Sequence, residues 1–179
     1  MAEHSRLFLA LWPTDETRQT LVRVSQALQV GGCKPVRSEN FHVTLVFLGH
    51  VDTVIESLIK QRVADIAAQP FTMIFDGLGY WPQPKVICLT CQHPAQELVR
   101  LVAALDSAVT SCGLATDPRP YIPHITLSKQ ARQLPDSVFE RVIWRAESFC
   151  LVESRRVQDY VRYEVIQEWP FRLKPGQSY

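Results

Sequence analysis

The sequence lacks an excess of charge of either sign. Its 19 lysines and arginines nearly balance 18 aspartates and glutamates, so the formal net charge is +1. The balance also holds along the chain, with 8 basic against 8 acidic residues in positions 1–90 and 11 against 10 in positions 91–179. Proteins that bind polyanions without specificity are usually strongly basic. We therefore expect any contact with nucleic acid to be local, at a terminus or over a few nucleotides.

A long apolar run and a disulfide framework are also missing. The apolar stretch at residues 7–12 is too short for a secretory signal, and no run approaches the roughly 18 apolar residues that cross a membrane. Five cysteines are an odd number, which argues against a secreted disulfide scaffold. We expect a protein of the reducing cytoplasm that makes no contact with membranes.

Neither glycine-rich nucleotide signature, G-x-G-x-x-G or G-x-x-x-x-G-K-[ST], is present. Cys88 and Cys91 form one C-x-x-C with His93 close behind, but a zinc site would need a second pair of ligands at a suitable spacing. No such pair is evident, and the two cysteines lie in a strand-like stretch. We expect buried or half-buried free thiols, no metal site and no cofactor.

What the sequence does contain is a short pattern that occurs twice, as His42-Val43-Thr44-Leu45 and His124-Ile125-Thr126-Leu127. In a β-strand, successive side chains point to opposite faces. Each histidine then shares a face with the threonine two residues later, whereas the apolar residues point into a core. The repetition predicts one cleft that holds two imidazoles and two hydroxyls.

Two imidazoles and two hydroxyls suit the cleavage of a phosphoester. Neutral imidazole accepts a proton and imidazolium donates one, so histidines on opposite sides of a substrate can act as general base and general acid. Threonine hydroxyls can donate hydrogen bonds to phosphate oxygens. These groups can activate water, protonate the leaving oxygen and stabilise the remaining charge, so a metal ion is not required. From the pattern alone, structural histidines in a duplicated sheet, or coincidence, remain the alternative.

Hydrophobic periodicity predicts alternating strands and helices. The expected strands are residues 6–12, 41–48, 71–75, 86–91, 121–128, 148–153 and 161–166. The expected helices are residues 15–29, 54–66 and 94–109. Gly49 should close the second strand, and strands 71–75 and 86–91 should form a hairpin with a loose loop. Residues 138–144 fit either a short helix or an edge strand. This order favours antiparallel sheets with helices outside them over a doubly wound parallel sheet.

Both copies of the motif extend into longer signatures. Residues 40–49 and residues 119–127 resemble the two signatures of the 2H phosphoesterase superfamily. They are specifically similar to those of the bacterial and archaeal RNA 2′,3′-cyclic phosphodiesterases, historically called 2′-5′ RNA ligases. The start of the chain, residues 6–10 followed by a proline and a helix, and its end, residues 163–171, are similar too. The resemblance covers nearly the whole chain.

The resemblance implies both a fold and a reaction. The fold is a single α+β domain, residues 1–179, of two pseudo-symmetric lobes, each an antiparallel sheet backed by helices, with a central cleft between the motif strands. The reaction is hydrolysis of a terminal 2′,3′-cyclic phosphate of RNA to a 2′-phosphate, without metal. The expected partners are RNA 3′ ends or small cyclic nucleotides, and the expected oligomeric state is a monomer. The physiological RNA stays open.

The resemblance also implies roles for single residues. His42 would be the proton donor to the leaving 3′ oxygen, and His124 the proton acceptor that activates water. Thr44 and Thr126 would bind the phosphate. Many relatives have an arginine two residues after the second motif, where this chain has Lys129. Lys129 could bind the reacting phosphate or the RNA backbone, but a lysine supplies a point charge, whereas an arginine can donate two parallel hydrogen bonds.

Further residues are candidates for contacts with RNA. Phe41, Tyr121 and Trp81 could stack on a terminal base, although aromatic side chains beside strands more often belong to the core. Arg119, in the loop before the second motif, could meet a backbone phosphate. Arg155-Arg156 fits a solvated turn better than a nucleic-acid patch.

Three functions are compatible with these residues. The first is the cyclic phosphodiesterase. The second is a 2′-5′ RNA ligase that acts through the same site, and the sequence does not rank the two because both reactions use the same residues. The third is a nucleotide- or RNA-end-binding module without turnover. Retention of both histidines and both threonines argues against this third function, because a binding module could lose one imidazole freely.

Overall fold

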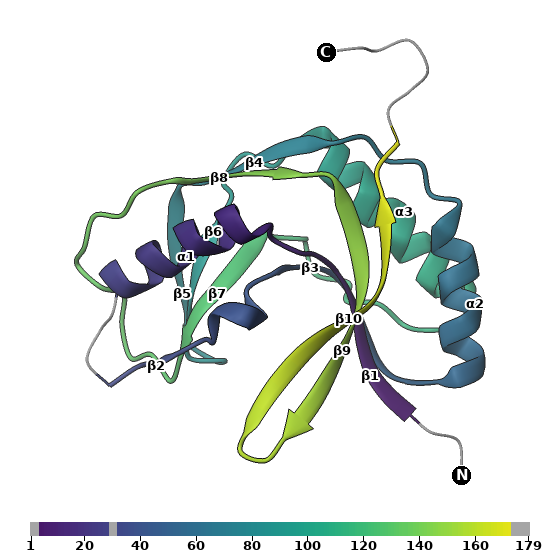
Figure 1. Cartoon of the computed structure of the whole chain (residues 1–179), viewed down its shortest axis with the longest axis horizontal. Helices are drawn as coiled ribbons and strands as arrows, with labels where there is room; N and C mark the ends of the chain where they lie inside the picture. The colour runs from purple at the N-terminus through teal and green to yellow at the C-terminus, as the bar shows by residue number, and fades with distance from the viewer. Residues whose placement is uncertain (1–3, 29–31, 173–179) are drawn as a thin grey trace.

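The chain folds into two four-stranded sheets and a two-stranded ribbon, as described for residues 4–28 and 32–172 by a computed structural model (Figure 1). The first sheet has the order β10 (Tyr160–Pro170), β9 (Ser148–Val157), β1 (His4–Leu11) and β3 (Val43–Asp52). The second has the order β2 (Lys34–Pro35), β7 (His124–Lys129), β6 (Val86–Thr90) and β5 (Gly77–Trp81). The ribbon pairs β4 (Phe71–Phe75) with β8 (Val142–Ala146), and neighbouring strands run antiparallel throughout.

The helices lie on the outside, and two of them pack against the sheet opposite to the one that contains the preceding strand. They are α1 (Asp15–Ala27), the 3-10 turn η1 (Ser38–Asn40), α2 (Thr53–Ala64) and α3 (Gln96–Ser111). β1 of the first sheet leads into α1, which lies over the second sheet, whereas β6 of the second sheet leads into α3, which lies with α2 against the first (Figure 1). The α+β class with antiparallel sheets and outer helices is confirmed. No helix in the described part of the chain is long and apolar enough to cross a membrane.

The motif strands contribute to the core as their alternation predicts. Val43 and Leu45 of β3, and Ile125 and Leu127 of β7, are all buried in one hydrophobic cluster that also takes side chains from α1, α2 and α3. Burying an aliphatic side chain of this size stabilises a fold by roughly 1.5–3 kcal/mol. The apolar halves of the two motifs therefore anchor the strands, and their polar halves are left on the opposite faces.

Gly49 does not end the second strand as expected. β3 continues to Asp52, and its register against β1 shifts, so that Leu7 faces Gly49 while Phe8 faces Phe47. The extra residue forms a bulge, and the φ of +75° at Gly49 is a backbone conformation that glycine adopts without steric cost. Gly49, which was expected to end the strand, instead lies at a β-bulge within it.

The predicted hairpin between residues 71–75 and 86–91 is wrong. β4 pairs with β8, which comes much later in the chain, and the hairpin partner of β6 is β5. A local pattern of alternating burial, as in β4, indicates a strand without naming its partner. The same pairing decides the ambiguous segment at residues 138–144, because its end belongs to the strand β8.

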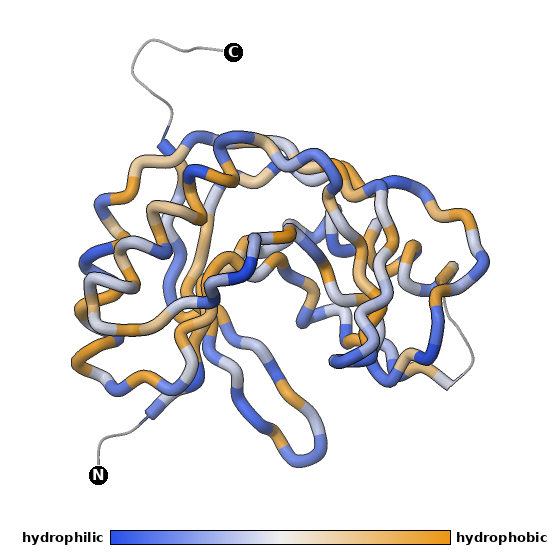
Figure 2. The backbone as a smooth tube through the Cα atoms, turned by 180° about the vertical axis from the view of Figure 1, so that it is seen from behind, coloured by the Kyte–Doolittle hydropathy of each residue, from blue (hydrophilic) through white to orange (hydrophobic). Residues whose placement is uncertain are grey.

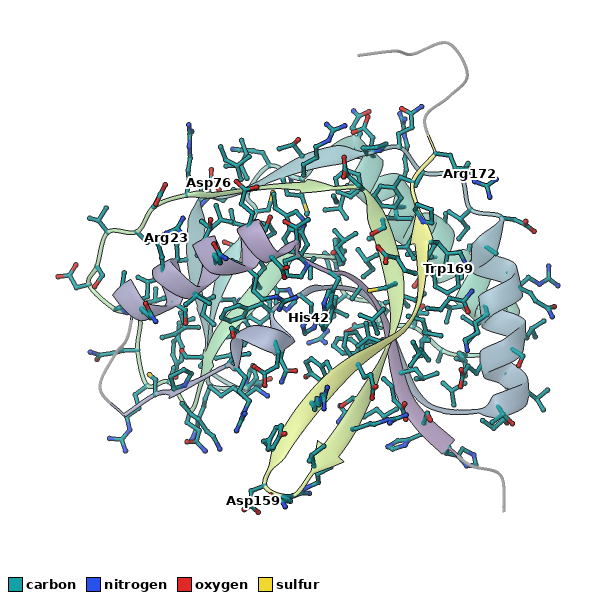
Figure 3. The ribbon with its side chains drawn as sticks, viewed as in Figure 1. Arg23, His42, Asp76, Asp159, Trp169 and Arg172 are labelled. Carbon is teal, nitrogen blue, oxygen red and sulfur yellow. The ribbon has the colours of Figure 1, made fainter. Side chains whose placement is uncertain are left out.

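The expected turn at Arg155 and Arg156 is wrong as well. Both residues lie in β9, and the turn follows at Gln158, whose φ is +51°. β9 and β10 extend as a hairpin away from the body of the molecule, with Asp159 at its hydrophilic tip (Figures 2 and 3). The two arginines are exposed, as the sequence indicates, but on a strand.

Candidate active site

The two motif histidines stand at the start of their strands. His42 directly precedes β3 of the first sheet, and His124 is the first residue of β7 of the second sheet. Figure 3 places His42 at the centre of the molecule, beside the base of the β9–β10 hairpin. The two sheets meet here, because the Tyr121 hydroxyl, just before β7, donates to the Thr44 carbonyl in β3 at 3.0 Å.

Each imidazole is held by the backbone carbonyl two residues before it. Nδ1 of His42 lies 2.6 Å from the Asn40 oxygen, and Nδ1 of His124 lies 2.8 Å from the Ile122 oxygen. A carbonyl oxygen only accepts, so Nδ1 of each ring carries the hydrogen and donates it. In the neutral form of either ring, Nε2 is then the basic nitrogen. The repeated geometry gives both histidines the same tautomer and leaves Nε2 for proton transfer.

The two threonines have different partners. Oγ1 of Thr44 lies 3.0 Å from Nε2 of His42, and this side chain is only 8% exposed. When His42 is neutral, the Thr44 hydroxyl donates to Nε2, which confirms that the two side chains share a face. Oγ1 of Thr126 lies instead 3.6 Å from the buried Cys88 Sγ on β6. The expected pairs are thus present on their strands, and among the residues that the structure describes a direct hydrogen bond joins His42 to Thr44 but not His124 to Thr126.

His42 lies among three aromatic rings that the sequence does not connect to it. Its ring centroid is 5.0 Å from that of Phe8, 5.1 Å from that of Tyr163, and 6.0 Å from that of Trp12, with Trp12 stacked at 21°. These residues come from β1, from the residue after it and from β10. His124 has one such neighbour, Trp81, whose ring meets it edge-on at 4.4 Å. Alternation along the expected strand 6–12 places Phe8, Ala10 and Trp12 on one face, but it does not show that this face meets His42 or Tyr163.

This environment keeps both imidazoles neutral at pH 7. The pKa of His42 is lowered to about 4, chiefly by burial and also by the nearby charges of His124 and Lys129, while the hydrogen bond to Asn40 acts in the opposite direction. Burial also lowers the pKa of His124, while its bond to Ile122 acts in the opposite direction. A negatively charged ligand between the two rings would raise both pKa values, because it stabilises the imidazolium form.

Asn40 links His42 to the projecting hairpin, a role the motif does not reveal. Its backbone carbonyl holds the imidazole, while its buried side-chain amide donates to the Val161 carbonyl at 2.7 Å and accepts from the Tyr163 N–H at 3.0 Å. β10 is an edge strand, so these two bonds satisfy backbone groups that have no strand neighbour. One residue therefore fixes both the imidazole of His42 and the edge of the first sheet.

The structure changes the interpretation of two aromatic candidates for RNA contact. Phe41 is 2% exposed and packs in the core, so the prediction that it contacts RNA is wrong. Tyr121 is partly buried against the same core and uses its hydroxyl on Thr44. Burial raises the pKa of Tyr121. The stacking of Tyr121 on a base stays a prediction, and Trp81 is now placed beside His124.

The charged candidates lie at the surface. Arg119 is exposed and forms an ion pair with Asp117, with Nε 2.9 Å from Oδ1. Lys129 is exposed at the end of β7, opposite Lys34 of β2, and close enough to His42 to affect its pKa. A role of Arg119 or Lys129 in binding phosphate stays a prediction. The cysteines of the C-x-x-C, Cys88 and Cys91, are buried free thiols, as expected.

Comparisons with known proteins agree over almost the full length. A model of the 2′-5′ RNA ligase superfamily matches residues 13–158. The RNA 2′,3′-cyclic phosphodiesterase of Escherichia coli (strain K12) is 29% identical over 174 residues, which cover 94% of the chain and 98% of that protein. The protein of the same name from Archaeoglobus fulgidus is 30% identical over 154 residues, covering 84% of the chain and 86% of that protein.

Solved structures give the same result. The structure of E. coli LigT complexed with 3′-AMP has a TM-score of 0.86 against this fold, at 26% identity over 96% of the chain and 100% of that chain. The structure of TT0787 of Thermus thermophilus has a TM-score of 0.77, at 27% identity over 93% of the chain and 98% of that chain. The likeness thus includes both sheets and the elements that carry His42 and His124.

We expect the pKa of His42 in the free protein to lie well below 6.5. Burial favours the neutral ring in the folded state, whereas the unfolded chain binds the proton at its ordinary pKa, so the free energy of unfolding falls as the pH drops from about 6.5 to 4. An NMR titration of the ring resonances measures the pKa directly. Urea unfolding across this pH range measures the stability, and His42→Ala should show a weaker dependence. A His42 that titrates at 6.5 or above would contradict the burial argument.

Asn40→Ala should lower the free energy of unfolding by about 1–2 kcal/mol, because it leaves a partly buried backbone donor and acceptor on β10 without their partner. Urea unfolding measures this loss. Ser38→Ala is the matched control in the same 3-10 turn, and its stability should stay within about 0.5 kcal/mol of the original. Equal stability of Asn40→Ala and Ser38→Ala would rule out this role for the amide.

Proposed function

Because the chain belongs to the 2′-5′ RNA ligase superfamily, we propose that it hydrolyses the 2′,3′-cyclic phosphate at the 3′ end of RNA to a 2′-phosphate. Relatives that match nearly its whole length are RNA 2′,3′-cyclic phosphodiesterases. The observation that carries the proposal is the pair of imidazoles held in one tautomer at the meeting of two sheets. The chain acts as one domain of two lobes, since each sheet supplies one histidine.

The two histidines divide the proton transfers. Neutral Nε2 of His124 takes a proton from water as the water oxygen bonds to phosphorus, and the bond from phosphorus to O3′ breaks. Protonated Nε2 of His42 gives its proton to O3′, so the product carries a 2′-phosphate and a free 3′ hydroxyl. The protons return to their starting places by exchange with solvent. General acid and general base catalysis of this kind each contribute roughly 10²–10⁴-fold, and no step needs a metal ion.

Substrate binding prepares the acid. In the free protein the pKa of His42 is about 4, so its ring is neutral and accepts a hydrogen bond from Thr44. The phosphate anion raises that pKa, and a protonated Nε2 no longer accepts. The Thr44 hydroxyl is then free to donate to a phosphate oxygen, and Thr126 supports a second oxygen from the other strand.

The wider setting follows from the same features. Substrates are RNA 3′ ends or small cyclic nucleotides, and the same site would catalyse 2′-5′ ligation if a 5′ hydroxyl replaced water as the nucleophile that attacks phosphorus. The protein acts as a monomer, because one chain supplies every group in the proposed mechanism. Its cysteines are free thiols, which fit the reducing cytoplasm.

The protein should convert an oligoribonucleotide ending in a 2′,3′-cyclic phosphate to one ending in a 2′-phosphate in the presence of EDTA, as read by chromatography and NMR of phosphorus. His42→Ala and His124→Ala should each lower kcat by about 10²-fold or more, because each loses one proton transfer. Val99→Ala, an exposed change on α3, is the control and should keep its activity. Absence of turnover by the unaltered protein would refute the proposed reaction, and full activity of either histidine variant would refute that assignment.

The dependence of kcat/KM on pH should be bell-shaped with its maximum below pH 7. The acidic limb follows protonation of His124, the alkaline limb follows loss of the proton from His42, and both pKa values are lowered in the free protein. The profile of kcat should lie at higher pH, because the bound phosphate raises the pKa values. A rate that rises steadily from pH 5 to pH 9 would contradict two-histidine catalysis.

A further inference from the structure

A groove of about 590 Å³ opens beside His42, a volume within the range of sites that bind small molecules. Two of its lining residues, Trp12 and Tyr163, are also ring neighbours of His42. Its remaining walls are Arg18 of α1, the turn η1 and the outer half of β10 from Tyr160. The groove therefore begins at two rings that neighbour His42 and runs outward along the β9–β10 hairpin.

The walls combine cations with aromatic rings. Arg18 lies over the Trp12 ring, with the guanidinium carbon 5.6 Å from the ring centroid. Arg162 is exposed, and its side chain has no ion pair among the described residues. The two acidic lining residues, Glu39 and Glu164, are each paired with an arginine, at 3.6 Å and 3.1 Å. The negative charges of these glutamates are thus offset. Arg18 and Arg162, together with the aromatic rings, make the groove suited to a polyanion that carries aromatic bases.

The groove is also held in shape before any ligand binds. Arg18 donates from Nη1 to the Ser38 carbonyl at 2.5 Å, which joins α1 to η1. Asn40 joins η1 to β10 through its side-chain amide. All three walls are therefore connected by hydrogen bonds, so a ligand does not have to order them, and this lowers the cost of binding.

The chemistry of the proposed reaction fixes which side of the phosphate carries the RNA. The attacking and leaving oxygens lie roughly in line across phosphorus. The leaving O3′ belongs to the ribose, so the nucleoside lies on the side of the histidine that protonates it, and the opposite side has to admit only water. With His42 as the donor, the ribose and the rest of the RNA point toward Trp12 and Tyr163 and enter the groove.

We propose that this groove binds the last nucleotides of a single-stranded RNA, with the terminal nucleoside at the Trp12 end and the preceding backbone passing Tyr160 and Arg162. The proposal rests on the proposed function and on His42 as the proton donor. It predicts a preference for oligoribonucleotides over mononucleotides, because only an oligonucleotide reaches the outer half of the groove.

The test compares two substrates, an eight-nucleotide RNA ending in a 2′,3′-cyclic phosphate and a mononucleoside 2′,3′-cyclic phosphate. Arg162→Glu should lower the ratio of kcat/KM for the octamer to that for the mononucleotide by about tenfold. It should also reduce the slope of log kcat/KM against log salt for the octamer by about one. Arg156→Glu is the matched control, since Arg156 is exposed on the same hairpin opposite Val161 and does not line the groove. It should leave both measurements unchanged.

A ratio unchanged in Arg162→Glu, or lowered equally by Arg156→Glu, would overturn the groove proposal. Binding separates this failure from a failure of the proposed function. The probe is a fluorescent octamer ending in a 3′-phosphate, followed by anisotropy, and Arg162→Glu should weaken its binding by about tenfold. Arg162-dependent binding without turnover would refute the hydrolase and support the groove. Turnover together with binding that does not depend on Arg162 would support the hydrolase and refute the groove.

Discussion

The hydrogen bond from Nδ1 of each histidine to the carbonyl two residues earlier is the constraint on which the site depends. It sets the tautomer, aims Nε2 and does so twice, through Asn40 and Ile122. Burial makes this bond necessary, because an imidazole in an apolar setting must place its N–H on an acceptor. Burial also lowers both pKa values, so the free protein holds two neutral bases, one of which turns into an acid only when an anion arrives.

Much of this arrangement could be predicted from the sequence, and the reason is local. Alternation within β3 and β7 predicts the shared face of His42 and Thr44 and the buried places of Val43 and Ile125, because the period of a strand is two residues whatever its partner. The polar pattern of the two repeats indicated the chemistry, and a resemblance to a family indicated the substrate.

What the sequence did not reveal depends on contacts between distant segments. The partner of β4 is β8, and nothing within residues 71–75 distinguishes that pairing from a hairpin. The rings around His42 come from β1 and β10, so no local window contains them. Phe41 was expected to contact RNA because it precedes His42 in the sequence. His42 belongs to the site, but the side chain of Phe41 points into the core. The lining of the groove escapes prediction for the same reason.

The place of β1 in its sheet has a consequence for how the protein is made. β1 is synthesised before both of its neighbours in the sheet, β3 and β9, and its partners Leu151 and Val152 follow about 140 residues later. Tyr163, which completes the rings around His42, comes later still. Contacts of such long sequence separation form slowly. Until β9 has been synthesised, the edge of β1 that β9 covers therefore has no strand partner, and an unpaired edge of this kind can pair with another chain.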